Sequence, residues 1–79
     1  MQPIDGIIEL LCRQEELESA MRRPGGVRII QERSLLALRD QLKAYPESVR
    51  AVLGAAHSLN RPVTSLSARD VEAWVGTSQ

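Results

Sequence analysis

The chain of 79 residues contains one cysteine, Cys12, and one histidine, His57, residue types widely used for nucleophilic catalysis and zinc binding. A reactive thiolate needs a helix N-terminus or neighbouring cations to lower its pKa. Cys12 is instead predicted in the middle of a helix, near Glu9, Glu15 and Glu16, whose charges raise the pKa of the thiol. His57 has no Asp, Glu, Cys or second His three or four residues away with which to form a catalytic dyad or a metal pair. The sequence therefore predicts a partly buried core cysteine and a surface histidine.

The carboxylates and glycines give no stronger indication of catalysis. Glu15, Glu16 and Glu18 point in different directions around a helix, whereas acid–base catalysis needs an apolar pocket that shifts the pKa of a carboxyl group. A short chain without phenylalanine hardly builds such a pocket. Gly25 and Gly26 are not followed by the Lys-Ser/Thr pair of a phosphate-binding loop. We therefore expect a non-enzymatic protein with no cofactor, no metal ion and no small-molecule substrate.

The distribution of charge is more informative than its sum. The ten Lys and Arg residues balance the ten Asp and Glu residues, which argues against indiscriminate binding to polyanions. Residues 1–21 carry one basic and five acidic side chains, residues 22–45 carry six basic and two acidic ones, and residues 46–79 are balanced. This asymmetry predicts either charge pairing within a helical hairpin, or pairing with a second copy or a charged partner helix. The two interpretations are compatible.

Arg22, Arg23 and Arg28 flank the predicted turn between the acidic and the basic segment. Arginine makes bidentate contacts with carboxylates and phosphates, so the cluster is either a solvated hairpin tip or a contact for a partner or a phosphate group. Nucleic-acid binding usually shows a basic stripe with aromatic residues or a known motif. The only aromatic residues, Tyr45 and Trp74, are expected in the core or at an interface. A small nucleic-acid-binding transcriptional regulator that uses these arginines is therefore the disfavoured alternative.

Prolines and glycines divide the chain into four segments, and each has the apolar spacing of an amphipathic helix. The spacing predicts a small all-α bundle that forms a single domain over residues 1–79. The first two helices are expected to form an antiparallel hairpin around the Pro24-Gly25-Gly26 turn, followed by a third helix and a short fourth. The predicted helices cover residues 4–22, 27–44, 47–59 and 67–75.

Local signals mark the start of the last two helices. Pro46 is suited to the first turn of the third helix, because its missing N–H would be unpaired there. Ser67 and Asp70 have the spacing of a capping box, and Leu66 and Val71 that of a hydrophobic staple. A loop is predicted over residues 60–65, and Gly76 is expected to end the fourth helix.

The small residues and apolar faces predict how the helices pack. The Gly54-Ala55-Ala56 stretch permits the close approach of another helix. Consecutive apolar pairs spread each face beyond one stripe, so we expect a surplus apolar surface that another copy or another protein buries. The residues expected in the core and at that interface are Leu35, Leu38, Leu42 and Trp74. The third helix is predicted to turn Val49, Val52, Leu53, Ala56 and Leu59 to one face.

These observations predict a small protein–protein interaction module, an adaptor, regulator or co-chaperone, that binds another protein or forms a homodimer. The acidic–basic hairpin with its Arg-Pro-Gly-Gly turn at residues 23–26 loosely resembles small helical-hairpin co-chaperones of bacterial secretion systems. The resemblance covers about half the chain and implies no residue roles. A cytoplasmic location with no membrane contact is expected, because the start of the chain lacks the features of a secretory signal and the longest run without a polar side chain, residues 51–56, is too short to span a bilayer.

Overall fold

The computed structural model describes residues 3–25 and 28–77, and side chains at 3–25 and 31–77. Four α-helices follow one another along the chain: α1 (Pro3–Met21), α2 (Arg28–Lys43), α3 (Pro46–Leu59) and α4 (Ala68–Thr77). A short 3₁₀-helix, η1 (Val63–Ser65), lies between α3 and α4. The described residues contain no β-strand, which confirms the predicted all-α fold. Val27, the predicted first residue of the second helix, lies outside the described residues.

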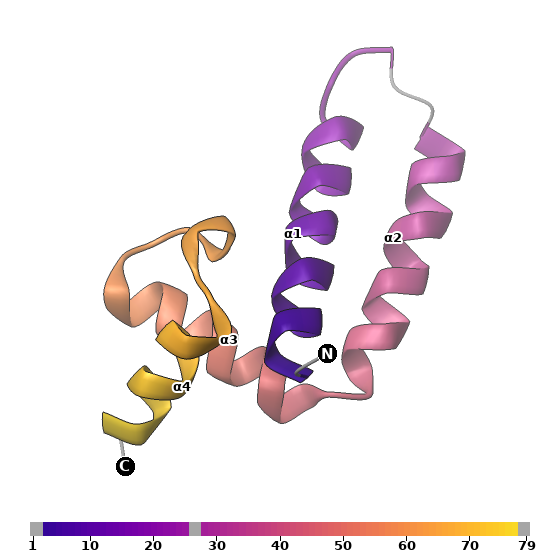
Figure 1. The fold of residues 1–79 in the computed structure, drawn as a ribbon. Helices are drawn as coiled ribbons and strands as arrows, with labels where there is room; N and C mark the ends of the chain where they lie inside the picture. Colours follow the sequence, from indigo (N-terminus) through magenta and orange to yellow (C-terminus); the bar gives the residue numbers. More distant parts are fainter. Residues whose placement is uncertain (1–2, 26–27, 78–79) are drawn as a thin grey trace.

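The first two helices form the predicted hairpin, running side by side in opposite directions (Figure 1). Because Leu35, Leu38 and Leu42 are three and four residues apart, they share one stripe of α2, and all three are buried. Ile7 and Leu11 are the corresponding buried residues of α1. A fully buried Leu or Ile side chain stabilises a fold by about 1.5–3 kcal/mol, so these stripes account for the pairing of α1 with α2.

Charge contributes less to the hairpin than the sequence asymmetry suggests. Among the described residues, a single ion pair joins α1 to α2, with 3.4 Å between Arg39 Nη2 and Glu18 Oε1. The Arg13–Glu9 pair lies within α1, and Lys43 pairs with Asp40 within α2. Exposed pairs of this kind contribute about 0.2–1 kcal/mol each. The apolar stripes therefore hold the hairpin together, with a small addition from charge.

α3 begins directly at Pro46 and crosses the open end of the hairpin, where η1 and α4 also pack (Figure 1). Among the described elements, α1 contacts α2, α3, η1 and α4, whereas α2 contacts only α1 and α3. The main core therefore lies at this end of the molecule. Its buried residues are Ile7, Leu11, Leu42, Val52, Ala55, Val63, Leu66 and Val71.

The face that α3 turns inward differs from the predicted one. Val52 and Ala55 are completely buried, but Leu53 and Leu59 are 47% and 41% exposed, so their predicted place on the inner face is wrong. The reason lies in the return of the chain, because η1 and α4 pack on the side of α3 that carries Val52 and Ala55. The predicted helix was correct, but the rotation of α3 about its axis, which decides which face points inward, depends on tertiary contacts.

The segment between α3 and α4 is more ordered than the predicted loop. Asn60 ends α3 in the left-handed region with φ 52°, and its N–H donates to the carbonyl of His57 over 3.2 Å. The 3₁₀-helix η1 was not predicted; it buries Val63 and is followed by buried Leu66. This segment therefore adds two residues to the core, because an apolar residue in a short 3₁₀ turn leaves no periodic signal.

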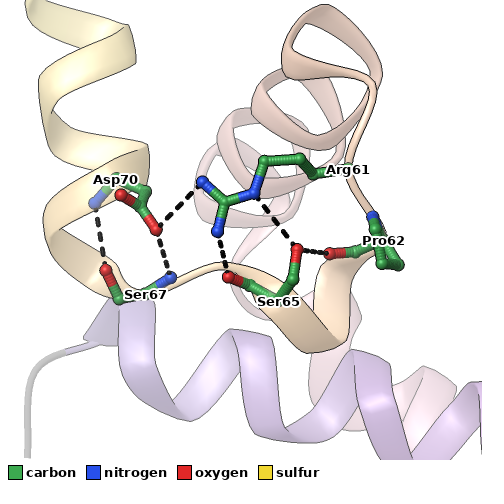
Figure 2. Close-up of polar contacts among 5 residues, drawn as sticks. All are labelled: Arg61, Pro62, Ser65, Ser67 and Asp70. Carbon is green, nitrogen blue, oxygen red and sulfur yellow. Dashed lines mark hydrogen bonds and ion pairs between the residues drawn. The ribbon is translucent and has the colours of Figure 1, made fainter.

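The start of α4 confirms the predicted capping box (Figure 2). The Ser67 N–H donates to Asp70 Oδ2 over 3.0 Å, and the Asp70 N–H donates to Ser67 Oγ over 3.2 Å. Leu66 and Val71 on either side are both buried, as expected for a hydrophobic staple. α4 continues to Thr77, one residue beyond Gly76, where the fourth helix was expected to end. Thr77 Oγ1 donates to the Trp74 carbonyl and supports this last turn.

The close approach predicted at Gly54 is present. The indole of half-buried Trp74 on α4 lies over this glycine, and a Cβ at position 54 would stand 2.7 Å from Trp74 Cη2. Two non-bonded carbon atoms essentially never approach this closely in proteins. Gly54 therefore lets α4 pack on α3 through its single tryptophan.

Candidate functional site

Arg22 and Arg23, the two arginines of the predicted hairpin-tip cluster whose side chains are described, line different hollows. Arg22 and Arg23 are both exposed after the end of α1. Arg22 lines a hollow that also holds Glu18 and Glu32, while Arg23 lines a separate hollow that also holds Glu15 and Glu16. The side chain of Arg28 lies outside the described residues.

Acidic side chains thus accompany each of the two described arginines. The carboxylates in each hollow reduce the positive potential that a phosphate would meet, and Glu18 in the hollow of Arg22 also pairs with Arg39 there. The geometry therefore gives no concentrated basic patch at the described part of the tip.

Cys12 is free and half-buried on α1, where it lines a hollow with Glu15, Glu16 and Thr64. Partial burial raises the pKa of the thiol, and the charges of Glu15 and Glu16 raise it further. The thiol therefore stays protonated at neutral pH and is a poor nucleophile. This agrees with the expectation for a core cysteine.

No metal site is present among the described residues, where no group of three His, Cys, Asp or Glu side chains comes together. His57 is exposed near the end of α3, as expected for a surface histidine. Over the same residues, no helix combines the length and the apolar character that a membrane span requires.

A cluster of polar contacts joins the loop after α3 to the start of α4 (Figure 2). Arg61 Nη1 lies 3.5 Å from Asp70 Oδ2, and its guanidinium also donates to Ser65 Oγ and to the Ser65 carbonyl. Ser65 Oγ in turn donates to the Pro62 carbonyl over 2.8 Å. Hydrogen bonds from the backbone and side chain of Ser67, aided by Arg61, lower the pKa of Asp70. Because these polar groups bond to one another, the cluster has a structural role and fixes the loop before α4.

The four leucine and tryptophan positions expected in the core and at an interface fall in different places. Leu35 and Leu38 are 6% and 8% exposed between the hairpin helices, and Trp74 is half-buried against Gly54. Leu42 is buried as well, but it forms part of the floor of an open groove. A role in partner binding stays a prediction for all four residues.

That groove, which we name the α3 groove, has a volume of about 830 Å³ and lies between α1, the end of α2 and one face of α3. Leu53, which is 47% exposed, is its most accessible large apolar side chain. Its lining residues are Leu11, Gln14, Arg39, Leu42, Lys43, Pro46, Val49, Arg50, Leu53, Gly54 and His57. No acidic side chain is among the described residues that line it, whereas three are Arg or Lys and one is His.

The chain has a second hollow of about 670 Å³ at the same end of the hairpin, and the two share no lining residue. Glu9 and Arg13, which line it, form an ion pair, so its polar groups compensate each other. The α3 groove lacks such internal compensation. Of the two, it is the better candidate for contact with another molecule.

The α3 groove was not predicted, because Leu53 was expected on the inner face of the third helix. A signal was nevertheless present. Arg50, Leu53 and His57 are separated by three and four residues and therefore share one face of a helix, with Pro46 four residues before Arg50. A helix face that carries leucine beside arginine and histidine is neither a purely apolar core stripe nor a purely polar face, and such a mixture is typical of a binding surface.

Comparison with known proteins adds no functional information. Scans against models of protein families, against curated proteins and against solved structures found no match for this chain.

Proposed function

We propose that this chain is a non-enzymatic protein–protein interaction module that holds a helix of its partner in the α3 groove. The observation that carries the proposal is the groove itself, which is open, has a volume of about 830 Å³ and has Leu53 as its most accessible large apolar side chain. Apolar grooves between helices are the usual acceptors for amphipathic helices, which place anchor residues at every third or fourth position. A cytoplasmic setting belongs to the proposal, since the single free cysteine suits a reducing compartment.

The groove has the length that a helix needs. From Pro46 to His57, α3 rises by about 17 Å. Three anchors at i, i+4 and i+7 of an amphipathic helix span only about 11 Å. Two to three turns of a partner helix therefore fit along the α3 wall of the groove.

The exposed apolar residues outside the groove supply a matched control. Leu36 on α2 is 59% exposed, more than Leu53, but it does not line the α3 groove. If exposed leucine alone attracted partners, Leu36 would matter at least as much as Leu53. If the groove binds the partner, Leu53 matters and Leu36 does not.

The test is selection of helical peptides from a random display library on the wild-type chain. We expect enriched peptides that also bind the Leu36→Glu variant and that lose binding to Leu53→Glu. Circular dichroism of both variants should match the wild type, because Leu36 is 59% and Leu53 47% exposed and neither side chain belongs to the buried core. Failure to enrich any peptide, or peptides that bind Leu53→Glu as well as the wild type, would refute the proposal.

The predicted nucleic-acid alternative rests on Arg22 and Arg23. Both are exposed, but each shares its hollow with two glutamates, so no observation favours phosphate binding. Affinity for DNA or RNA that falls steeply with salt and is lost on replacing both arginines by alanine would support that alternative instead.

A further inference from the structure

We propose that the partner helix in the α3 groove is acidic, an amphipathic helix with Glu or Asp flanking its apolar face. This inference rests on the proposed function and adds the chemistry of the partner. Three observations support it: the charged side chains that line the groove are basic, their ion pairs within the chain are weak or absent, and the same charges would repel a second copy of the groove.

The cations of the groove line its two walls. Arg39 and Lys43 stand on the α2 side, while Arg50 stands on the α3 side, where the polar imidazole of His57 also lines the groove. Leu42 and Leu53 lie among them. A helix that sets its apolar residues on the leucines therefore brings the flanks of its apolar face to positive groups on both sides.

These cations remain available to a partner. Arg50 makes no ion pair within the described residues, and it is exposed. Arg39 and Lys43 do pair with Glu18 and Asp40, but at 3.4 Å between partly exposed groups and at 3.6 Å between largely exposed ones. Exposed pairs of this kind are weak, so a carboxylate on the partner competes readily for the same cations.

The same charges disfavour a second copy in this position. In a symmetric dimer the groove would face its own image, since an isologous interface uses the same patch on both subunits. Arg39, Lys43 and Arg50 of one copy would then approach the same residues of the other, and like charges across an interface are unfavourable. The charge pattern therefore selects an acidic partner over a symmetric homodimer through this surface.

The probes are two synthetic helical peptides with the same leucines at i, i+4 and i+7. One carries Glu and the other Lys at every flanking position, and a scrambled acidic peptide controls for charge alone. Fluorescence anisotropy measures their affinity for the full chain. We expect the acidic peptide to bind at least about tenfold more tightly than the basic one at low salt, with a preference that shrinks as salt increases.

Two charge-reversal variants test the location. Arg50→Glu should abolish or reverse the preference, whereas Arg33→Glu, the same change at an exposed α2 position outside the groove, should leave it intact. Leu53→Glu should weaken both peptides. Binding of the scrambled peptide equal to that of the ordered one would overturn the inference, because charge alone would then suffice.

Other outcomes separate this inference from the proposed function. Equal affinity for both peptides, lost in Leu53→Glu, overturns the acidic partner but leaves a groove that binds helices. Self-association that light scattering shows to depend on Leu53 makes a second copy the occupant, and it overturns the acidic partner in the same way. No binding of either peptide, in a chain that stays monomeric and yields no Leu53-dependent peptide from the library, overturns both.

Discussion

The two ends of the hairpin are built differently. At its open end, which we call the base, α1 packs on α3, η1 and α4, and Val52, Ala55 and Val71 are completely buried. Toward its closed end, which we call the arm (residues 15–25 and 31–38), α2 packs only on α1 (Figure 1), and Thr64 of η1 lines a hollow beside Glu15 and Glu16 of α1. The base therefore has a core with contacts in several directions, whereas the arm has a single seam.

This difference explains why the candidate site lies at the base. The α3 groove takes its floor and walls from three elements, and only the base brings α1, α2 and α3 together. The arm offers exposed charges, but its acidic and basic groups neighbour one another. An apolar surface bordered by basic side chains thus arises where the chain folds back on the hairpin.

The largest expected effect tests the difference in packing. Ile7→Ala at the base should lower the free energy of unfolding by about 2–5 kcal/mol, because Ile7 is 2% exposed and its neighbours on several elements hold a cavity open. Leu35→Ala in the arm should cost less, since a two-helix seam can close on the gap. Urea unfolding followed by circular dichroism measures both. Equal losses would contradict the distinction, and Leu36→Ala, an exposed control, should change little.

The next effect concerns the contact that closes the base. Gly54→Ala gains about 1 kcal/mol of helix propensity, but overlap of its Cβ with Trp74 costs about 1–3 kcal/mol. We expect a net destabilisation and a red shift of the fluorescence of Trp74, the single tryptophan, as the indole moves into water. Gly76→Ala is the matched control, because a Cβ there meets nothing within 4 Å. A stabilised Gly54→Ala with unchanged fluorescence would refute this packing.

A smaller effect concerns the start of α4. Ser67→Ala should lower the free energy of unfolding by about 0.5–2 kcal/mol, because the N–H of Asp70 loses its acceptor. Ser58→Ala, an exposed serine of α3 with no such bond among the described residues, is the control and should be near neutral.

The capping box also predicts a dependence on pH. The pKa of Asp70 is lower in the folded chain than its ordinary value of 3.8. The ionised carboxylate therefore contributes fully to the free energy of unfolding above pH 3.8, and this contribution is lost as the pH falls through the pKa of the folded chain. The stability difference between wild type and Asp70→Asn should therefore shrink below pH 3.8. A difference that persists unchanged in stronger acid would contradict this role of the carboxylate.

The smallest effect concerns the ion pair across the hairpin. A double-mutant cycle on Arg39 and Glu18 should give a coupling of about 0.2–1 kcal/mol that falls with salt, since both groups are partly exposed. A coupling well above that range would show that charge, and not the leucine stripe, holds α1 against α2.

Features with a local cause could be predicted from the sequence. Pro46 marks the start of α3, because it lacks the N–H that would be unpaired there. Ser67 and Asp70 mark the start of α4, because their side chains accept hydrogen bonds from backbone N–H groups. The spacing of Leu35, Leu38 and Leu42 defines a buried stripe of α2. These signals were sufficient for the four helices and the hairpin.

Features that depend on the return of the chain could not be predicted. The exposure of Leu53 and Leu59 follows from the side on which η1 and α4 pack, and that side has no signature within α3. The segmental charge asymmetry was real, but among the described residues it yields one ion pair between α1 and α2. The α3 groove was missed for the same reason, because it exists only where three helices meet.

The most direct test of the account is a map of backbone amide chemical shifts during titration of the chain with the acidic helical peptide. The account predicts that shifts concentrate on the groove residues of the base, above all Arg50, Leu53 and His57, while residues 15–25 of the arm do not move. Shifts concentrated around Arg22 and Arg23, or no shifts at saturating peptide, would contradict it.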